Sequence, residues 1–161
     1  MEHIEKIIKL QDINILAIAV FSITISIIDI KTYRIPDILL LLLLIALLLN
    51  DFITGYHSIV SHLLSAVIVF ALFFAIFYFA RGMGFGDVKY AAVLAYGLGL
   101  KGIYIAIAVA VISGLLFFLV RALFLGWNKK RKLAFAPFLS LGAIASIIIG
   151  RLWTTGWLYS L

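Results

Sequence analysis

Two of the chain's seven acidic residues, Asp29 and Asp87, lie where apolar segments end or begin. Asp29 closes the uncharged run of residues 13–28, and Asp87 opens a second apolar segment. An ionisable group at the edge of the hydrocarbon is costly unless it is paired, solvated or functional. If the two carboxyl groups converge, only one ionises cheaply. One can then activate water as a base while the other protonates a leaving amine as an acid.

Three alternating glycines, Gly82, Gly84 and Gly86, precede Asp87. Because they have no side chains, a peptide backbone could lie close to the carboxylate, and the loop could adopt positive φ angles. A phosphate-binding loop is disfavoured, since the spacing is not the dinucleotide pattern and no lysine–serine pair follows. Taken alone, the acids could equally be structural, with Asp87 as a helix N-cap and Asp29 as a solvated interfacial acid.

The elements that position these acids must lie in a membrane. The 161 residues are 66% hydrophobic and only 12% charged, with a mean hydropathy of +1.25, whereas a soluble domain has about 25% charged residues. This composition excludes a soluble globular protein and indicates a polytopic membrane protein. The net charge of +6 is then a feature of membrane loops, not a sign of nucleic-acid binding. With no cysteine, a thiolate metal site is excluded.

The hydropathy pattern predicts an all-α bundle of about six transmembrane helices. They are expected at residues 13–28, 36–49, 59–80, 88–100, 102–125 and 137–153. The fourth is short and could be re-entrant. Small residues recur four apart in the last two, which favours close packing within the bundle over a dimerisation face. The four acids other than Asp29, Asp37 and Asp87 are expected on solvated surface; they are Glu2, Glu5, Asp12 and Asp51.

Basic residues indicate the orientation of the bundle. They are more numerous in the loops after the first, third and fifth expected helices, including the run Lys129–Lys132, than on the opposite side. Cytoplasmic loops carry an excess of Lys and Arg, so these loops are expected in the cytoplasm and both termini outside. Asp29 and Asp87 then lie near the cytoplasmic face.

Asp37 and Lys89 are the charged neighbours of the two acids. Asp37 follows Pro36 in the first turn of an expected helix, where a dipole and capping role is favoured over catalysis. Lys89 lies two residues past Asp87, about 200° round a helix. It is therefore expected to extend to lipid head groups and not to pair with that acid, although a structural or substrate-leader role stays open.

Three segments, in order, resemble the signatures of the type IV prepilin peptidases, which belong with the GxGD membrane aspartyl proteases. Residues 84–89, GFGDVK, look like the GxGDxK signature. Residues 29–37, DIKTYRIPD, are similar to the family's first catalytic segment. Residues 134–142, AFAPFLSLG, resemble the phenylalanine- and proline-rich start of the family's last helices.

The resemblance implies an endopeptidase that removes the short basic leader from type IV prepilins or pilin-like secretion subunits at the cytoplasmic face of the plasma (inner) membrane. Asp29 and Asp87 match its catalytic pair, and Gly84, Gly86 and Lys89 are expected to bind substrate or shape the loop. No metal and no cofactor are expected. The implied partners are prepilin or pseudopilin leader peptides and membrane lipid, with the oligomeric state open. Residues 1–161 are expected to form a single membrane-embedded peptidase domain without a soluble N-terminal methyltransferase domain.

Two other functions are compatible with the same acids. A small transporter or channel that uses Asp29 and Asp87 as an ion site would need further charged or polar groups deep in its helices. Between Asp37 and Arg81 only Asp51 is charged, and it is expected in a turn. A catalytically idle subunit of a secretion machine would tolerate substitution of both aspartates.

Overall fold

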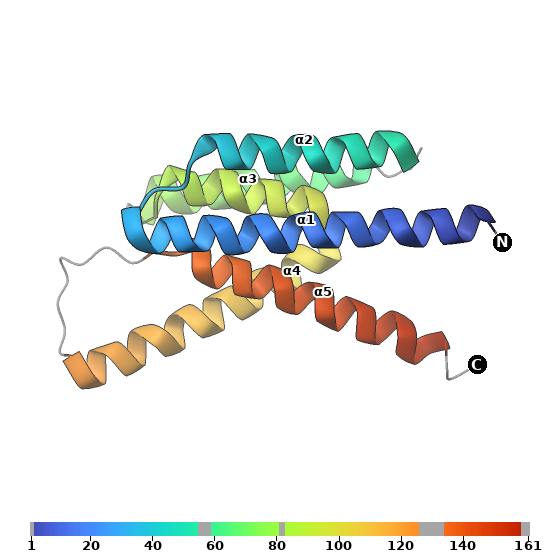
Figure 1. Cartoon of the computed structure of the whole chain (residues 1–161). Coiled ribbons are helices and arrows are strands. Elements are labelled where there is room, and N and C mark those ends of the chain that lie inside the picture. The colour runs from blue at the N-terminus through green and yellow to red at the C-terminus, as the bar shows by residue number, and fades with distance from the viewer. Residues whose placement is uncertain (1, 55–58, 81–82, 126–133, 159–161) are drawn as a thin grey trace.

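Five helices make up the described part of the chain in the computed structural model (Figure 1). The structure describes residues 2–54, 59–80, 83–125 and 134–158, with side chains described in 13–53, 59–79, 83–124 and 134–151. The helices are α1 (Glu2–Thr32), α2 (Asp37–Thr54), α3 (Ile59–Ala80), α4 (Phe85–Leu125) and α5 (Ala136–Leu158). The expectations for Gly82 and Lys129–Lys132, and for the side chains of Glu2, Glu5 and Asp12, concern residues outside the described part.

In the part of the chain that the structure describes, three helical segments are long and apolar enough to cross a membrane: Ile13–Thr32, Ile59–Phe79 and Phe85–Phe124. The chain is therefore an all-α membrane protein. The exact count of about six transmembrane helices is not shown, because only these three segments are long and apolar enough among the described residues. The helices expected at 88–100 and 102–125 both lie within α4.

A backbone break nevertheless divides α4 at Gly99. Its φ of 67° and ψ of 175° are a conformation that residues with side chains rarely adopt. Tyr90 before the break lies 2.7 Å from Ser140 of α5, and Phe117 after it packs on Phe138 of the same helix. Along a straight helix Tyr90 and Phe117 would be about 40 Å apart. The chain thus turns back at Gly99, as Figure 1 shows.

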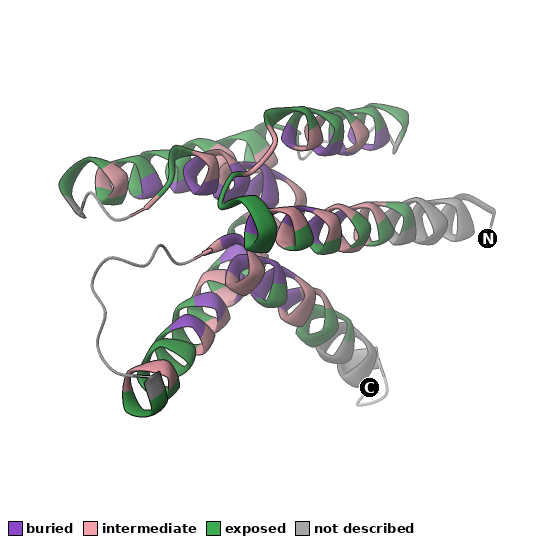
Figure 2. Ribbon diagram, turned by 60° about the vertical axis from the view of Figure 1, so that its left-hand side comes forward, coloured by how far each residue is buried: buried purple, intermediate pink, exposed green. Residues whose placement is uncertain are grey.

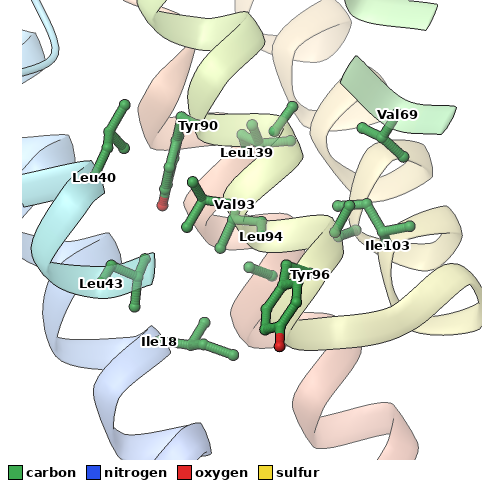
Figure 3. Close-up of a cluster of buried hydrophobic side chains, with 14 of the residues drawn as sticks. Ile18, Leu40, Leu43, Val69, Tyr90, Val93, Leu94, Tyr96, Ile103 and Leu139 are labelled. Carbon is green, nitrogen blue, oxygen red and sulfur yellow. The ribbon is translucent and has the colours of Figure 1, made fainter. Parts of the chain in front are cut away.

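The core surrounds the first part of α4, residues 85–98. All four other helices pack against α4. Small residues such as Ala91 and Ala95, both fully buried, let neighbours approach it closely. Figure 3 shows Val93 and Leu94 of α4 together with side chains that meet them from the surrounding helices; these include Ile18, Leu40, Leu43, Val69 and Leu139.

The outward faces of the helices are apolar, as expected for contact with lipid. Phe79 and Phe124 are each 82% exposed, and Figure 2 shows exposed residues along the outer sides of the helices. A soluble monomer rarely exposes so much continuous apolar surface. The small residues on α4 and α5 instead face each other: a Cβ on Gly142 would overlap the backbone carbonyl of Ala106. Packing within the bundle is confirmed at this position.

The expectation that Asp51 lies on solvated surface is wrong. Asp51 is 4% exposed and accepts a hydrogen bond of 2.8 Å from the Tyr96 hydroxyl. The Nδ1 atom of His62 lies 3.4 Å from the same carboxyl oxygen. The physical reason is that α2 continues past residue 49 to Thr54. Asp51 therefore falls on the same helix stripe as the buried Leu43 and Leu47.

Candidate active site

Asp29 lies in the last turns of α1 and is 5% exposed. It continues a buried stripe that includes Ser22 and Ile25, at the three- and four-residue spacing of one helix face. Its Oδ2 atom accepts a hydrogen bond of 3.3 Å from the backbone N–H of Ala136, the first residue of α5. The carboxylate of Asp29 thus binds the positive end of a second helix.

The start of α5 explains why an N–H group is available to Asp29. The carbonyl of Phe135 accepts the N–H groups of Phe138 and Leu139 at 3.1 and 3.2 Å, so the helix begins at this point. Pro137 is tolerated in the first turn because the first N–H groups of a helix have no partner within it. The N–H of Ala136 is one of these groups, and Asp29 satisfies it.

Asp87 lies in the first turn of α4 and is 8% exposed. Its Oδ2 atom accepts a 3.1 Å hydrogen bond from the N–H of Gly84, while its own N–H donates to the Gly84 carbonyl at 3.1 Å. The first bond is one half of a capping box, in which the side chain of the third helical residue, Asp87, accepts the N–H of the N-cap residue, Gly84; the second is a backbone bond, because glycine has no side chain to complete the box. Asp87 is therefore not itself the N-cap.

Gly84 and Gly86 are needed for close approach and not for unusual backbone angles. A Cβ on Gly84 would lie 3.2 Å from the Asp87 carboxylate, and a Cβ on Gly86 would lie 3.1 Å from that of Ile35. Among the described glycines a positive φ occurs only at Gly99. The expectation of positive φ at Gly84 and Gly86 is therefore wrong, but the expectation that they leave room beside the carboxylate is confirmed for Gly84.

The two carboxyl groups lie at the same end of the bundle, because α1 ends and α4 begins there (Figure 1). Tyr90, one turn after Asp87, donates a 2.8 Å hydrogen bond to Ser22, two turns before Asp29. This direct contact fixes the two helix ends beside each other. The arrangement can hold one neutral and one charged carboxyl group side by side.

Lys89 does not pair with Asp87, as expected, but its partner is Asp37 and not a lipid head group. The Lys89 ammonium lies 2.8 and 2.9 Å from the two carboxylate oxygens of Asp37 and 5.1 Å from the centre of the Phe85 ring. This ion pair joins the first turns of α2 and α4. Asp37 is in the first turn of its helix, as predicted. Within the described residues, no three His, Cys, Asp or Glu side chains gather as a metal site requires.

The three sequence signatures therefore meet at one place. In the segment after Asp29, Ile35 lies against Gly86, and Asp37 forms the ion pair with Lys89. Asp29 itself accepts the hydrogen bond from the start of α5. The model of the type IV leader peptidase family matches residues 16–119, which include both aspartates and the GFGDVK segment. The chain belongs to the type IV leader peptidase family.

One curated relative of this chain supports its assignment to the leader peptidase family. The "Prepilin leader peptidase/N-methyltransferase" of Pectobacterium carotovorum subsp. carotovorum is 32% identical over 142 residues, which are 80% of this chain and 48% of the relative. The chain thus spans about half the length of that relative. No solved structure matches the chain.

Sequence reasoning missed two polar clusters inside this leader peptidase family member. One consists of hydroxyl groups beneath the acids, contributed by Ser22, Ser26, Tyr90 and Ser140. The other joins Asp51, His62 and Tyr96 at the far end. The spacing of Ser22, Ser26 and Asp29 along one helix face was a usable signal for the first cluster.

Proposed function

We propose that this chain is an aspartyl endopeptidase that removes the leader peptide of type IV prepilins or pilin-like secretion subunits, with Asp29 and Asp87 as the catalytic pair. The observation that carries the proposal is the placement of both aspartates, buried, at the same end of the bundle. Each is held by a backbone N–H at the start of a helix. Membership of the leader peptidase family and the name of the curated relative support the substrate class.

The chemistry follows from two carboxyl groups that share one proton. The charged carboxylate takes a proton from water as the water oxygen adds to the scissile carbonyl. The neutral carboxyl group donates its proton to the departing amine as the C–N bond breaks. Gly84 leaves the Asp87 carboxylate open on one side, because a larger residue there would crowd it. A metal and a cofactor are not needed for these steps.

The proposed site faces the cytoplasm. The exposed Lys31 lies in the last turn of α1, and the exposed Arg34 lies in the connection from α1 to α2. Such basic residues favour the cytoplasmic side of a plasma membrane, where they also meet anionic lipid. The membrane bundle itself carries the proposed activity as one peptidase domain, and nucleic acid has no part in it.

Conservative substitutions test this proposal. Asp29→Asn and Asp87→Asn should each lower leader cleavage at least about a thousandfold, because each removes an ionisable carboxyl group from a pair that acts as a unit. The measurement is cleavage of a prepilin-type substrate by membranes that contain equal amounts of each variant. Asp37→Asn is the matched control and should retain activity, since Asp37 binds Lys89 and not the pair. Full cleavage by either of the first two variants would reject the proposal.

One structural observation gives the transporter alternative more support than it had from the sequence alone. Asp51, expected in a solvated turn, is a buried acid with Tyr96 and His62 around it. Buried ionisable groups of this kind mark ion pathways in some membrane proteins. The measurement is ion flux into vesicles that contain the purified chain. Flux that Asp29→Asn, Asp87→Asn and Asp51→Asn each abolish would support the transporter, whereas the peptidase proposal expects no such flux.

A further inference from the structure

Four hydroxyl side chains form a buried hydrogen-bond network between α1, α4 and α5. Tyr90 donates to Ser22 Oγ at 2.8 Å and lies 2.7 Å from Ser140 Oγ. Ser26 donates to Ser140 Oγ at 2.7 Å. Tyr90 and Ser22 are fully buried, and Ser140 is 4% exposed. Each hydroxyl has one hydrogen, so donation from Ser26 to Ser140, then to Tyr90, then to Ser22 makes these three bonds at once. The Ser22 carbonyl is an alternative acceptor for the hydroxyls of Ser26 and Ser140, at 2.7 and 3.1 Å, and it also joins α1 to α5.

Each helix contributes to the network within one turn of a group that forms the proposed site. Ser26 precedes Asp29 by three residues on α1. Tyr90 follows Asp87 by three residues on α4. Ser140 lies one turn after the N–H group of α5 that binds Asp29. Residues three or four apart lie on the same helix face, so the network lies directly beneath both carboxyl groups.

The network matters because α1 and α4 make little direct contact elsewhere, while each packs more extensively on α5. Apolar packing is non-directional and tolerates small shifts of one helix along another. Hydrogen bonds depend steeply on distance and angle. The bonds of Tyr90 to Ser22 on α1 and Ser140 on α5 therefore set how far the end of α1 lies from the start of α4.

We propose that Tyr90 is a positioning residue for peptide cleavage, which holds the Asp29 and Asp87 carboxyl groups at their working separation through its bonds to Ser22 and Ser140. The inference rests on the proposed peptidase function. Tyr90 is fully buried beneath the pair and does not itself meet substrate. Its loss should change the rate of the chemical step and leave substrate binding unchanged.

Tyr96 provides a matched control on the same helix. It is 1% exposed, and its hydroxyl donates a 2.8 Å hydrogen bond to Asp51. Figure 3 shows Tyr90 and Tyr96 on the same part of α4 with Val93 and Leu94 between them. Tyr96→Phe removes the same hydroxyl group and one buried hydrogen bond at the end remote from the proposed site.

The experiment compares kcat, KM and the melting temperature of the full chain, purified in lipid nanodiscs, with a prepilin-type substrate. Assays are run well below the melting transition of each variant. Tyr90→Phe should lower kcat about tenfold to a hundredfold, as expected when reacting groups are misplaced by about an ångström, with KM within about twofold of the unsubstituted chain. Tyr96→Phe should leave kcat and KM within about twofold of the unsubstituted chain, even if its melting temperature falls as much as that of Tyr90→Phe.

Serine variants keep the test decisive if Tyr90→Phe does not accumulate. Ser140→Ala should give the same loss of kcat, with Ser146→Ala as its control. Ser146 is also 4% exposed on α5, but its hydroxyl donates to the Gly102 carbonyl at 2.7 Å, away from the network. Because the network acts as a unit, the Tyr90→Phe/Ser140→Ala double variant should be no slower than the slower single variant.

Two results overturn the inference. The first is an unchanged kcat in Tyr90→Phe and Ser140→Ala. The second is a loss of kcat in the control variants, Tyr96→Phe and Ser146→Ala, as large as in Tyr90→Phe and Ser140→Ala. Such a loss would indicate a general effect of lowered stability. Failure of the proposed function itself would look different: the unsubstituted chain would not cleave the substrate, or Asp29→Asn would cleave it fully.

Discussion

The bundle buries aspartates at both of its ends, and the two ends hold their carboxyl groups differently. At one end Asp29 and Asp87 accept backbone N–H groups, and the two carboxyl groups share that end of the bundle. At the other end Asp51 accepts the Tyr96 hydroxyl and lies beside His62. A carboxylate among donors is stabilised in its charged form, whereas two adjacent carboxyl groups cannot both be charged cheaply. Burial alone does not identify a reactive acid, but the kind of partner does.

Asp51→Leu is the substitution with the largest expected effect on stability at the far end. It leaves the buried Tyr96 hydroxyl without the acceptor that it has in the structure. An unsatisfied buried hydroxyl costs about 1–3 kcal/mol, so the melting temperature should fall clearly. Leader cleavage should stay within about threefold of the unsubstituted chain. Thermal melting and a cleavage assay check both points. If Asp51→Leu lost cleavage while its melting temperature stayed unchanged, the claim that only the end with Asp29 and Asp87 is catalytic would be contradicted.

A pair of glycine substitutions sharpens the contrast between the ends. Gly84→Ala places a methyl group 3.2 Å from the Asp87 carboxylate, so cleavage should fall several-fold with little change in melting temperature. Gly99→Ala meets no atom within 4 Å but must adopt a φ of 67° and a ψ of 175°, which costs a residue with a side chain about 1–3 kcal/mol. Its melting temperature should fall while cleavage is kept. The opposite pattern in the same two assays would contradict the assignment of the ends.

The Lys89–Asp37 ion pair should show the smallest effect. The Asp37 side chain is 71% exposed and that of Lys89 is 37% exposed, so solvent screens their attraction. Exposed pairs contribute about 0–1 kcal/mol. Lys89→Met should therefore lower stability by at most that amount and cleavage by less than about threefold. A much larger loss of cleavage, not restored by the charge-reversed pair Asp37→Lys/Lys89→Asp, would give Lys89 a direct role in substrate binding.

Helix positions and the place of the two acids followed from sequence because they depend on local signals. Pro36 and Asp37 precede and open α2 as their helix preferences predict. Gly84 leaves room beside the Asp87 carboxylate, as the lack of a side chain predicts. Asp29 and Asp87 were expected near one membrane face, whereas the convergence of all three signatures is seen only in the contacts of Asp29 with Ala136 and of Gly86 with Ile35.

What sequence could not provide was the choice of partners across helices. Lys89 has Asp37 as its partner because the first turns of α2 and α4 lie side by side, which no periodicity within either helix reveals. The break at Gly99 was expected near residue 100, but glycines also occur within unbroken helices, so helix count could not be fixed. The burial of Asp51 was accessible in principle, since it extends the stripe of Leu43 and Leu47.

The central claim is that Asp29 and Asp87 act as one pair, and the rates of the single and double asparagine variants test it most directly. If the carboxyl groups form a unit, the Asp29→Asn/Asp87→Asn variant should cleave a prepilin-type substrate no more slowly than either single variant. Each should be at least about a thousandfold slower than the unsubstituted chain. Substantial cleavage by any of the three, or a double loss equal to the product of the single losses, would contradict the account.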